Sequence, residues 1–193
     1  NKGGESLYMI KHLGTKTIDT DRLILRRFEI SDANDMFKNW ASDAEVSKFL
    51  SWDSHKDVMV TKSLLDYWIS EYSDDKTYHW AIELKELKEV IGDIKAYNLK
   101  DKRSSCEVGY CLSRQFWNKG IMSEALNSVI KYLFEEINLN RIVAMHNTEN
   151  IASGKVMIKN NMKYKGTLKQ VGKLNGNFYD LSLYSILKSE WKS

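Results

Sequence analysis

The chain has 193 residues, of which 42% are hydrophobic and 28% charged, and this balance excludes a disordered protein. Its 29 basic and 26 acidic side chains give a net charge of +3, far below the basic excess of a dedicated nucleic-acid-binding protein. No apolar run reaches the length of a membrane span and no signal-peptide pattern begins the chain, so we expect a cytoplasmic protein without membrane partners.

The first residues lack a helix or strand pattern. We interpret residues 1–16 as a loosely attached lead-in to one domain, which spans residues 17–193. Within that domain, the segment 20–28 alternates its side chains as a strand does. Ser31 is placed to cap a helix whose apolar stripe runs from Ala33 to Trp40.

The middle of the chain contains a second helix and three strands. Apolar side chains recur at spacings of three and four over 58–72, which predicts an amphipathic helix. Segments 78–84 and 90–99 have the composition of two hairpin strands, and 106–113 of a further strand.

The strongest helical pattern of the chain lies at 121–137, where a broad apolar face runs through the whole length. A buried strand at 141–146 and a short helix at 152–160 follow. Two late strands, 162–170 and 178–187, flank the turn signal Asn175-Gly176.

This order of elements predicts the α/β class, with one mixed sheet and helices on both of its faces. The connection from strand 106–113 through the long helix to strand 141–146 should be parallel and right-handed. Cys106 and Cys111 point to opposite faces of one strand, so we expect no disulfide between them. The four histidines are scattered, and we expect no metal site.

Charge is unevenly distributed along the chain. Residues 151–179 contain six lysines and no acidic residue, whereas residues 66–93 contain eight acidic residues and three lysines. The first stretch would attract anions and the second cations. Two solvated faces of different sign explain the same distribution equally well.

The junction between strand 106–113 and the long helix has the features of an anion site. The first turn of a helix has unpaired N–H groups and a partial positive charge. Gly120 lets a ligand approach the backbone closely, and Asn118 is a residue type that tolerates left-handed geometry. A glycine at a helix start is also common in a simple turn, so spacing alone leaves both interpretations open.

The segment QFWNKG at 115–120 resembles the Gln/Arg-x-x-Gly-x-Gly/Ala loop of the GCN5-related N-acetyltransferase (GNAT) superfamily, which binds the pyrophosphate of acetyl-CoA. Asn118 stands where that family usually has glycine. Further segments, in order, resemble the ribosomal-protein (RimJ/RimL-like) branch from about residue 17 to the C-terminus: TDRLILRRF, VIGDI, EVGYCL, KGIMSEAL, NIAS and YDLSLYSILKSEW.

This resemblance implies a GNAT-like fold, a mostly antiparallel sheet in which the parallel strands 106–113 and 141–146 splay apart around the pantetheine arm. It implies cosubstrate contacts from Asn150 (which equally suits a plain helix N-cap), from Ser153, and from Lys155 and Lys159 near the 3′-phosphate. The remaining implied contacts are Tyr110, Cys111 and Leu112 along the arm, and Trp117, Asn118, Lys119, Gly120, Ile121 and Met122 around the pyrophosphate.

The resemblance also implies direct transfer of an acetyl group from a thioester to an amine. In the superfamily a tyrosine often protonates the leaving thiolate, but Met157 stands at that position here. The ribosomal-protein branch that the chain resembles has a serine three residues after the asparagine, which implies this role for Ser153, although a small residue there would equally serve helix packing. The candidates for a general base are Glu107 and Glu45, with His146 as a further candidate. Cys111 is expected to face the acetyl group without forming a covalent intermediate.

Amine chemistry favours a protein or peptide N-terminus as acceptor. At pH 7 about 0.04% of a lysine amine is neutral, against roughly 10–15% of an α-amine. A polyamine or an aminoglycoside remains an alternative, because the acidic stretch 66–93 would attract polycations. A non-catalytic acyl-CoA-binding module is a second alternative, and a nucleic-acid-binding protein is poorly supported, because the lysine-rich stretch contains few aromatic residues. The sequence leaves monomer and homodimer open.

Overall fold

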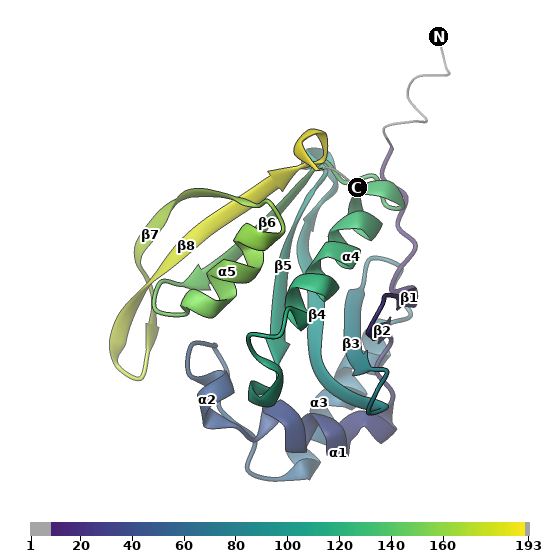
Figure 1. Ribbon diagram of the computed structural model, residues 1–193, viewed down its shortest axis with the longest axis vertical. Helices are drawn as coiled ribbons and strands as arrows, with labels where there is room; N and C mark the ends of the chain where they lie inside the picture. Colours follow the sequence, from purple (N-terminus) through teal and green to yellow (C-terminus); the bar gives the residue numbers. More distant parts are fainter. Residues whose placement is uncertain (1–8, 192–193) are drawn as a thin grey trace.

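One sheet of eight strands forms the centre of the computed structural model, which describes residues 9–191 (Figure 1). The strand order is β1-β2-β3-β4-β5-β6-β8-β7. The strands are β1 (Ile18–Asp19), β2 (Leu23–Arg26), β3 (Tyr78–Leu84), β4 (Glu89–Lys100), β5 (Ser105–Leu112), β6 (Arg141–Asn147), β7 (Lys163–Leu174) and β8 (Asn177–Leu187).

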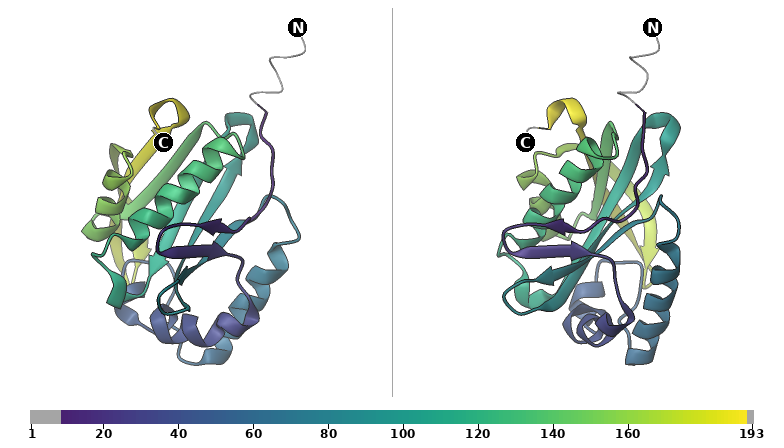
Figure 2. Two further views of the ribbon diagram at one scale, coloured as in Figure 1. Left: turned by 45° about the vertical axis from the view of Figure 1, so that its right-hand side comes forward. Right: turned by 90° about the vertical axis from the view of Figure 1, so that its right-hand side faces the viewer.

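Helices cover both faces of this sheet, as the order of elements predicts. The long helix α4 (Ile121–Glu135) and the shorter α5 (Ile151–Lys159) lie on one face. Helix α3 (Val58–Glu71) lies on the other, with the short helices α1 (Ala33–Met36) and α2 (Ala44–Ser47) at the lower edge (Figures 1 and 2). Within residues 9–191, no helix is long and apolar enough to cross a membrane.

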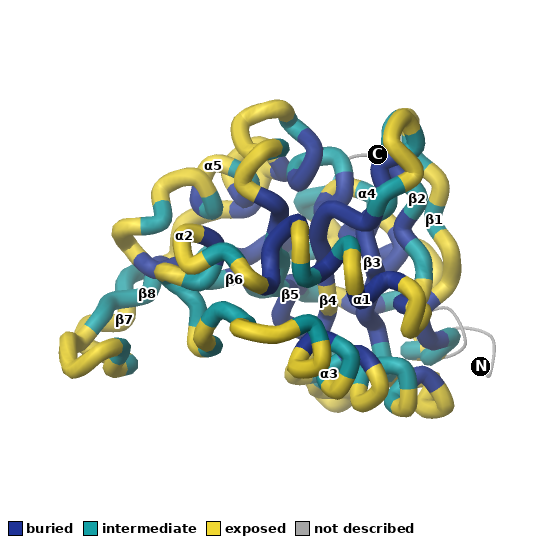
Figure 3. The backbone as a smooth tube through the Cα atoms, turned by 90° about the horizontal axis from the view of Figure 1, so that it is seen from below, coloured by how far each residue is buried: buried dark blue, intermediate teal, exposed yellow. Residues whose placement is uncertain are grey.

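Two hydrophobic cores follow from this arrangement, one on each face of the sheet. The first packs α4 against the central strands, and its fully buried side chains include Trp80, Leu126 and Phe134. The second packs α1 and α3 against the opposite face and contains Trp40 and Leu65. The central strands are therefore buried, whereas the outer part of the β7–β8 hairpin is largely exposed (Figure 3).

The beginning of the domain differs from the sequence-based expectation in two places. Residues 10–16 are not loosely attached: Gly14 accepts a hydrogen bond from the Tyr132 hydroxyl, and Lys16 accepts one from the Trp80 indole, each at 2.7 Å through the backbone carbonyl. Residues 1–8 lie outside the described part of the chain. Ser31 is not a helix cap, because a 3₁₀ turn begins one residue earlier at Ile30 and leads directly into α1.

The parallel strands β5 and β6 separate along their length. They pair in parallel from Ser105 and Arg141 to Val108 and Ala144, which confirms the predicted parallel pair. Beyond this point β6 pairs only with β8, and the edge of β5 from residue 109 to 112 has no paired residue on β6. This separation is where the site lies.

Candidate active site

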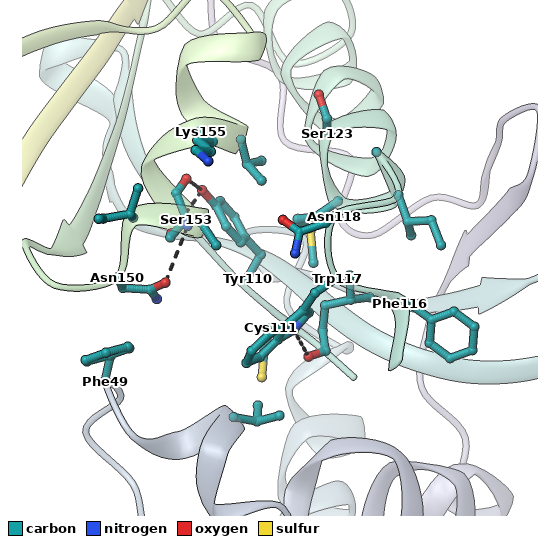
Figure 4. Close-up of a pocket in the computed structure, with 18 of the residues that line it drawn as sticks. Phe49, Tyr110, Cys111, Phe116, Trp117, Asn118, Ser123, Asn150, Ser153 and Lys155 are labelled. Carbon is teal, nitrogen blue, oxygen red and sulfur yellow. Dashed lines mark hydrogen bonds between the residues drawn. The ribbon is translucent and has the colours of Figure 1, made fainter. Parts of the chain in front are cut away.

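A cavity of about 400 Å³ opens where β5 leaves β6 (Figure 4). Its walls come from α2 and the residues after it, from the end of β5, from the loop that leads into α4, and from the first turns of α4 and α5. Segments distant in sequence therefore meet around one space. A volume of this size is typical of a small-molecule site.

The loop before α4 has the backbone that the sequence predicts. Asn118 and Gly120 both adopt left-handed conformations, with φ of 60° and 74°. Gly120 is the residue before the first turn of α4, and no side chain caps the amides of that turn. The Trp117 indole donates a hydrogen bond to the Leu112 carbonyl at 2.8 Å, which fixes the loop to the end of β5. Uncapped amides thus lie at the cavity wall, where they can bind an anion.

Hydrogen bonds from the turn before β2, which the sequence did not reveal, connect that turn to this loop and to α4. The Glu124 carboxylate accepts hydrogen bonds from the Thr20 hydroxyl at 2.7 Å and from the Arg22 backbone N–H and Nε at 2.9 and 2.8 Å. Arg22 also donates from Nη1 to the Lys119 carbonyl at 2.9 Å. The turn before β2 is therefore hydrogen-bonded to both the loop and α4, and Lys119 takes part through its backbone carbonyl.

Stability should depend on the charge of Glu124. Burial raises the pKa of this carboxyl, but hydrogen bonds from Thr20 and Arg22 outweigh burial and hold the pKa below its usual value. A lowered folded-state pKa means that the stabilisation is present above the unfolded value of about 4.3 and is lost as the pH falls through the folded value. We expect Glu124→Gln to lower the free energy of unfolding at pH 7 by about 1 kcal/mol, because the pair is partly exposed.

Denaturant unfolding at several pH values measures this effect. The difference between Glu124→Gln and the unaltered protein should shrink as the pH falls below about 4. Glu135→Gln is the matched control, because Glu135 is an exposed carboxylate at the far end of the same helix. A difference that stays constant with pH would contradict a role for the charge.

Helix α5 presents its first turn to the cavity. The Asn150 side chain caps this helix, since its oxygen accepts a hydrogen bond from the Ser153 N–H at 3.4 Å. The Ser153 hydroxyl donates to the Tyr110 hydroxyl at 3.2 Å, and Tyr110 donates to the Ser153 carbonyl at 2.8 Å (Figure 4). Burial raises the pKa of Tyr110 above its usual value, so the phenol stays protonated at neutral pH. Two protonated hydroxyl groups therefore lie side by side in the cavity wall.

The candidate bases occupy different environments. Glu45 is exposed and lines the cavity from α2. Glu107 does not line it: Oε2 accepts a hydrogen bond from Asn98 Nδ2 at 2.7 Å, and Oε1 is buried without a partner among the described residues. Glu107 also lies where β5 and β6 are still paired.

Two further residues from the sequence analysis serve packing. The His146 ring is buried beneath α5, where a Cβ added to Gly154 would come within 2.7 Å of its Nε2. Its Nδ1 lies 2.7 Å from the Asn147 carbonyl oxygen. Met157, which stands at the position of the family's tyrosine, is buried in the core. Neither side chain lines the cavity.

The structure brings most of the expected site residues together around the one cavity. Glu107, Lys119 and His146 are the three that do not line it. Those that do are Glu45, Tyr110, Cys111, Leu112, Trp117, Asn118, Gly120, Ile121, Met122, Asn150, Ser153, Lys155 and Lys159. Sequence reasoning missed the apolar wall after α2, which includes Phe49 and Leu50, because this short helix shows no extended periodicity.

A mixed sheet whose parallel strands separate around a cavity, with uncapped helix amides beside it, is the arrangement that the resemblance to the N-acetyltransferases implies. The family model of the acetyltransferase (GNAT) domain matches residues 22–163, and the chain belongs to this family.

Individual relatives agree with this assignment. The chain is 32% identical over 171 residues to an uncharacterized N-acetyltransferase, YoaA, from Bacillus subtilis, covering 89% of this chain and 96% of the relative. It is 23% identical to the [ribosomal protein uS5]-alanine N-acetyltransferase of Escherichia coli, over 90% and 92% of the two chains. A crystal structure of a GNAT acetyltransferase from Bacillus anthracis matches with a TM-score of 0.80 at 26% identity, over 91% of this chain and all of that one.

Proposed function

We propose that the protein transfers an acetyl group from acetyl-CoA directly to a primary amine, and that this amine is the α-amine of a peptide or protein N-terminus. The observation that carries the proposal is the cavity at the unpaired edge of β5, next to the uncapped start of α4. An extended arm that pairs with a strand edge and ends in a diphosphate has the chemistry that these two features bind.

The residues present fit acetyl-CoA along its length. The backbone of residues 110–112 would pair with the pantetheine amides as a neighbouring strand does. The amides of residues 117–122 would bind the pyrophosphate, and the Asn150 amide nitrogen is available to the pantetheine because only its oxygen caps α5. Lys155 and Lys159 line the cavity and would attract the 3′-phosphate.

Bound acetyl-CoA supplies an acetyl group activated as a thioester. The Ser153 hydroxyl, hydrogen-bonded to Tyr110, would donate the proton that the departing thiolate needs. Glu45, exposed at the cavity wall, would attract the ammonium group of the acceptor.

Two arguments support an α-amine as the acceptor. An α-amine loses its proton far more easily than a lysine amine, by about 3.5 kcal/mol at neutral pH. The relative from Escherichia coli that aligns over most of the chain, at 23% identity, is named a [ribosomal protein uS5]-alanine N-acetyltransferase.

A thiol-release assay across acceptors tests this proposal. We expect turnover with peptides that begin with a free alanine or serine, and none with the same peptides carrying a blocked N-terminus and an internal lysine. Turnover with polyamines or aminoglycosides alone would overturn the choice of acceptor. Saturable acetyl-CoA binding without turnover of any amine would identify a non-catalytic acyl-CoA-binding module.

A further inference from the structure

A carboxylate and an imidazole form a buried pair within the sheet, on the face opposite α4. The His79 Nε2 atom of β3 lies 2.7 Å from the Asp93 Oδ2 atom of β4, and the two residues are 6% and 8% exposed. The His79 ring packs against the rings of Phe28 and Trp68, with centroid distances of 5.2 and 4.4 Å. Burying such a pair costs desolvation energy, so a contribution to stability alone does not explain why the pair is there.

Neither residue of the pair lines the cavity, but Asp93 lies directly across from a residue that does. Asp93 is the direct register partner of Cys111 on β5, and side chains in such a pair have Cβ atoms about 4.5–5.5 Å apart. Cys111 lines the cavity, and its sulfur points away from Asn150 and Ser153 (Figure 4). The Asp93 carboxylate therefore lies beside the strand that lines the cavity, on the sheet face opposite α5.

The opposite strand explains how the pair forms. The residue directly across from Asp93 on β3 is Ala81, whose small side chain leaves room. His79 reaches Asp93 from the diagonal position, two residues along the same strand, and diagonal neighbours in a sheet are within reach of long side chains. One Asp93 oxygen is thus held by His79, and the other has no hydrogen-bond partner among residues 9–191.

Neither Glu45 nor Glu107, the two carboxylates considered as bases above, combines these properties. Glu45 is exposed to water, where a carboxylate has no fixed orientation. Glu107 lies four residues before Cys111 on the same strand, which is about 13 Å at the rise of a β-strand. Asp93 is held in place by His79 and lies directly across from Cys111, which lines the cavity.

We propose that Asp93 accepts a proton from the acceptor amine as the amine approaches the thioester, and that His79 is a positioning residue that fixes the Asp93 carboxylate. This inference rests on the acetyl transfer proposed above. In the transfer, a C–N bond forms while the C–S bond breaks. An acceptor ammonium loses two protons overall: one passes to water through Asp93, and the thiolate gains the equivalent of the other from Ser153 and Tyr110.

Two titratable side chains near Asp93 stay protonated at neutral pH and therefore do not compete with it as proton acceptors. They are Tyr72, directly after α3, and Cys111 of β5. Burial raises the pKa of Tyr72 to about 12 and that of Cys111 well above its usual value, and Asp93 adds to both shifts. Lys95, two residues further along β4, is exposed. His79 is the titratable group in direct contact with the Asp93 carboxylate.

Asp93→Asn tests the proposal, because asparagine keeps the size of the side chain and still offers an oxygen to His79. We expect the turnover number with an alanine-initiated peptide at pH 7 to fall by about 100-fold or more. Acetyl-CoA affinity, measured by calorimetry, should stay unchanged. His79→Gln should lower turnover by about tenfold, again with acetyl-CoA affinity intact. Asp66→Asn, on the exposed side of α3, is the matched control and should behave as the unaltered protein.

The pH profile separates proton acceptance from a structural role. As the pH rises, more of the acceptor is already neutral, so the deficit of Asp93→Asn should shrink. It should close near pH 9 for a peptide α-amine with a pKa of about 8. Thermal unfolding of each variant serves as a folding check.

Three results would overturn the inference. The first is an Asp93→Asn protein that turns over like the unaltered one. The second is a deficit that does not change between pH 6 and pH 9. The third is a large loss in Glu45→Gln with none in Asp93→Asn. Absence of turnover by the unaltered protein is a separate outcome, which rejects the proposed transferase together with this step.

Discussion

Gly120→Asp is expected to weaken acetyl-CoA binding by a factor of about 10² to 10⁴. The new carboxylate would stand at the start of α4, where the uncapped amides would bind the pyrophosphate. Hydrogen bonds between amides and a charged group contribute roughly 1.5–3 kcal/mol each, and the loss of two of them corresponds to this factor. Calorimetric titration with acetyl-CoA measures the effect directly.

Gly120→Asn is the control that separates charge from backbone strain. Gly120 has φ of 74°, and asparagine and aspartate tolerate this region better than other side chains. A Cβ added at this position meets only Arg22 Nη2, at 3.5 Å, so both variants have similar space. We expect Gly120→Asn to lose at most about tenfold in affinity. Equal losses in the two variants would show that strain, and not charge, explains the effect.

The longer helices, most strands and the backbone of the loop before α4 could be predicted because they depend on local pattern. The long helix α4 has an apolar face over its full length, and the left-handed pair Asn118 and Gly120 is visible as residue types. The short helix α2 has four residues, too few for any periodicity. The attachment of residues 10–16 depends on hydrogen bonds to Trp80 and Tyr132, which lie more than 60 residues away.

The parts of the site that escaped prediction are contacts between distant residues. Nothing near Arg22 in the sequence indicates Glu124, 102 positions later, as its partner. The same is true of His79 and Asp93, which meet only because Ala81 lies directly opposite Asp93 in the sheet. The segments TDRLILRRF and VIGDI resemble family segments, which indicated that these regions belong to the domain but not which contacts their side chains make.

Combining Ser153→Ala with Tyr110→Phe is expected to lower turnover by about 100-fold or more while leaving acetyl-CoA affinity nearly unchanged. These changes remove the two hydroxyl groups that lie 3.2 Å apart and would supply the thiolate proton. Because the hydroxyls act as one unit, the double variant should lose little more than the more impaired single variant. Tyr164→Phe, which removes an exposed hydroxyl on β7, is the control.

The pH dependence of this deficit should run opposite to that of Asp93→Asn. A missing proton donor can be replaced by acids in the buffer, so the deficit of the double variant should shrink as the pH falls. A missing proton acceptor becomes unnecessary once the amine is neutral, so the Asp93→Asn deficit should shrink as the pH rises. If the two deficits changed in the same direction with pH, the assignment of Ser153 and Tyr110 as proton donors and Asp93 as proton acceptor would be contradicted.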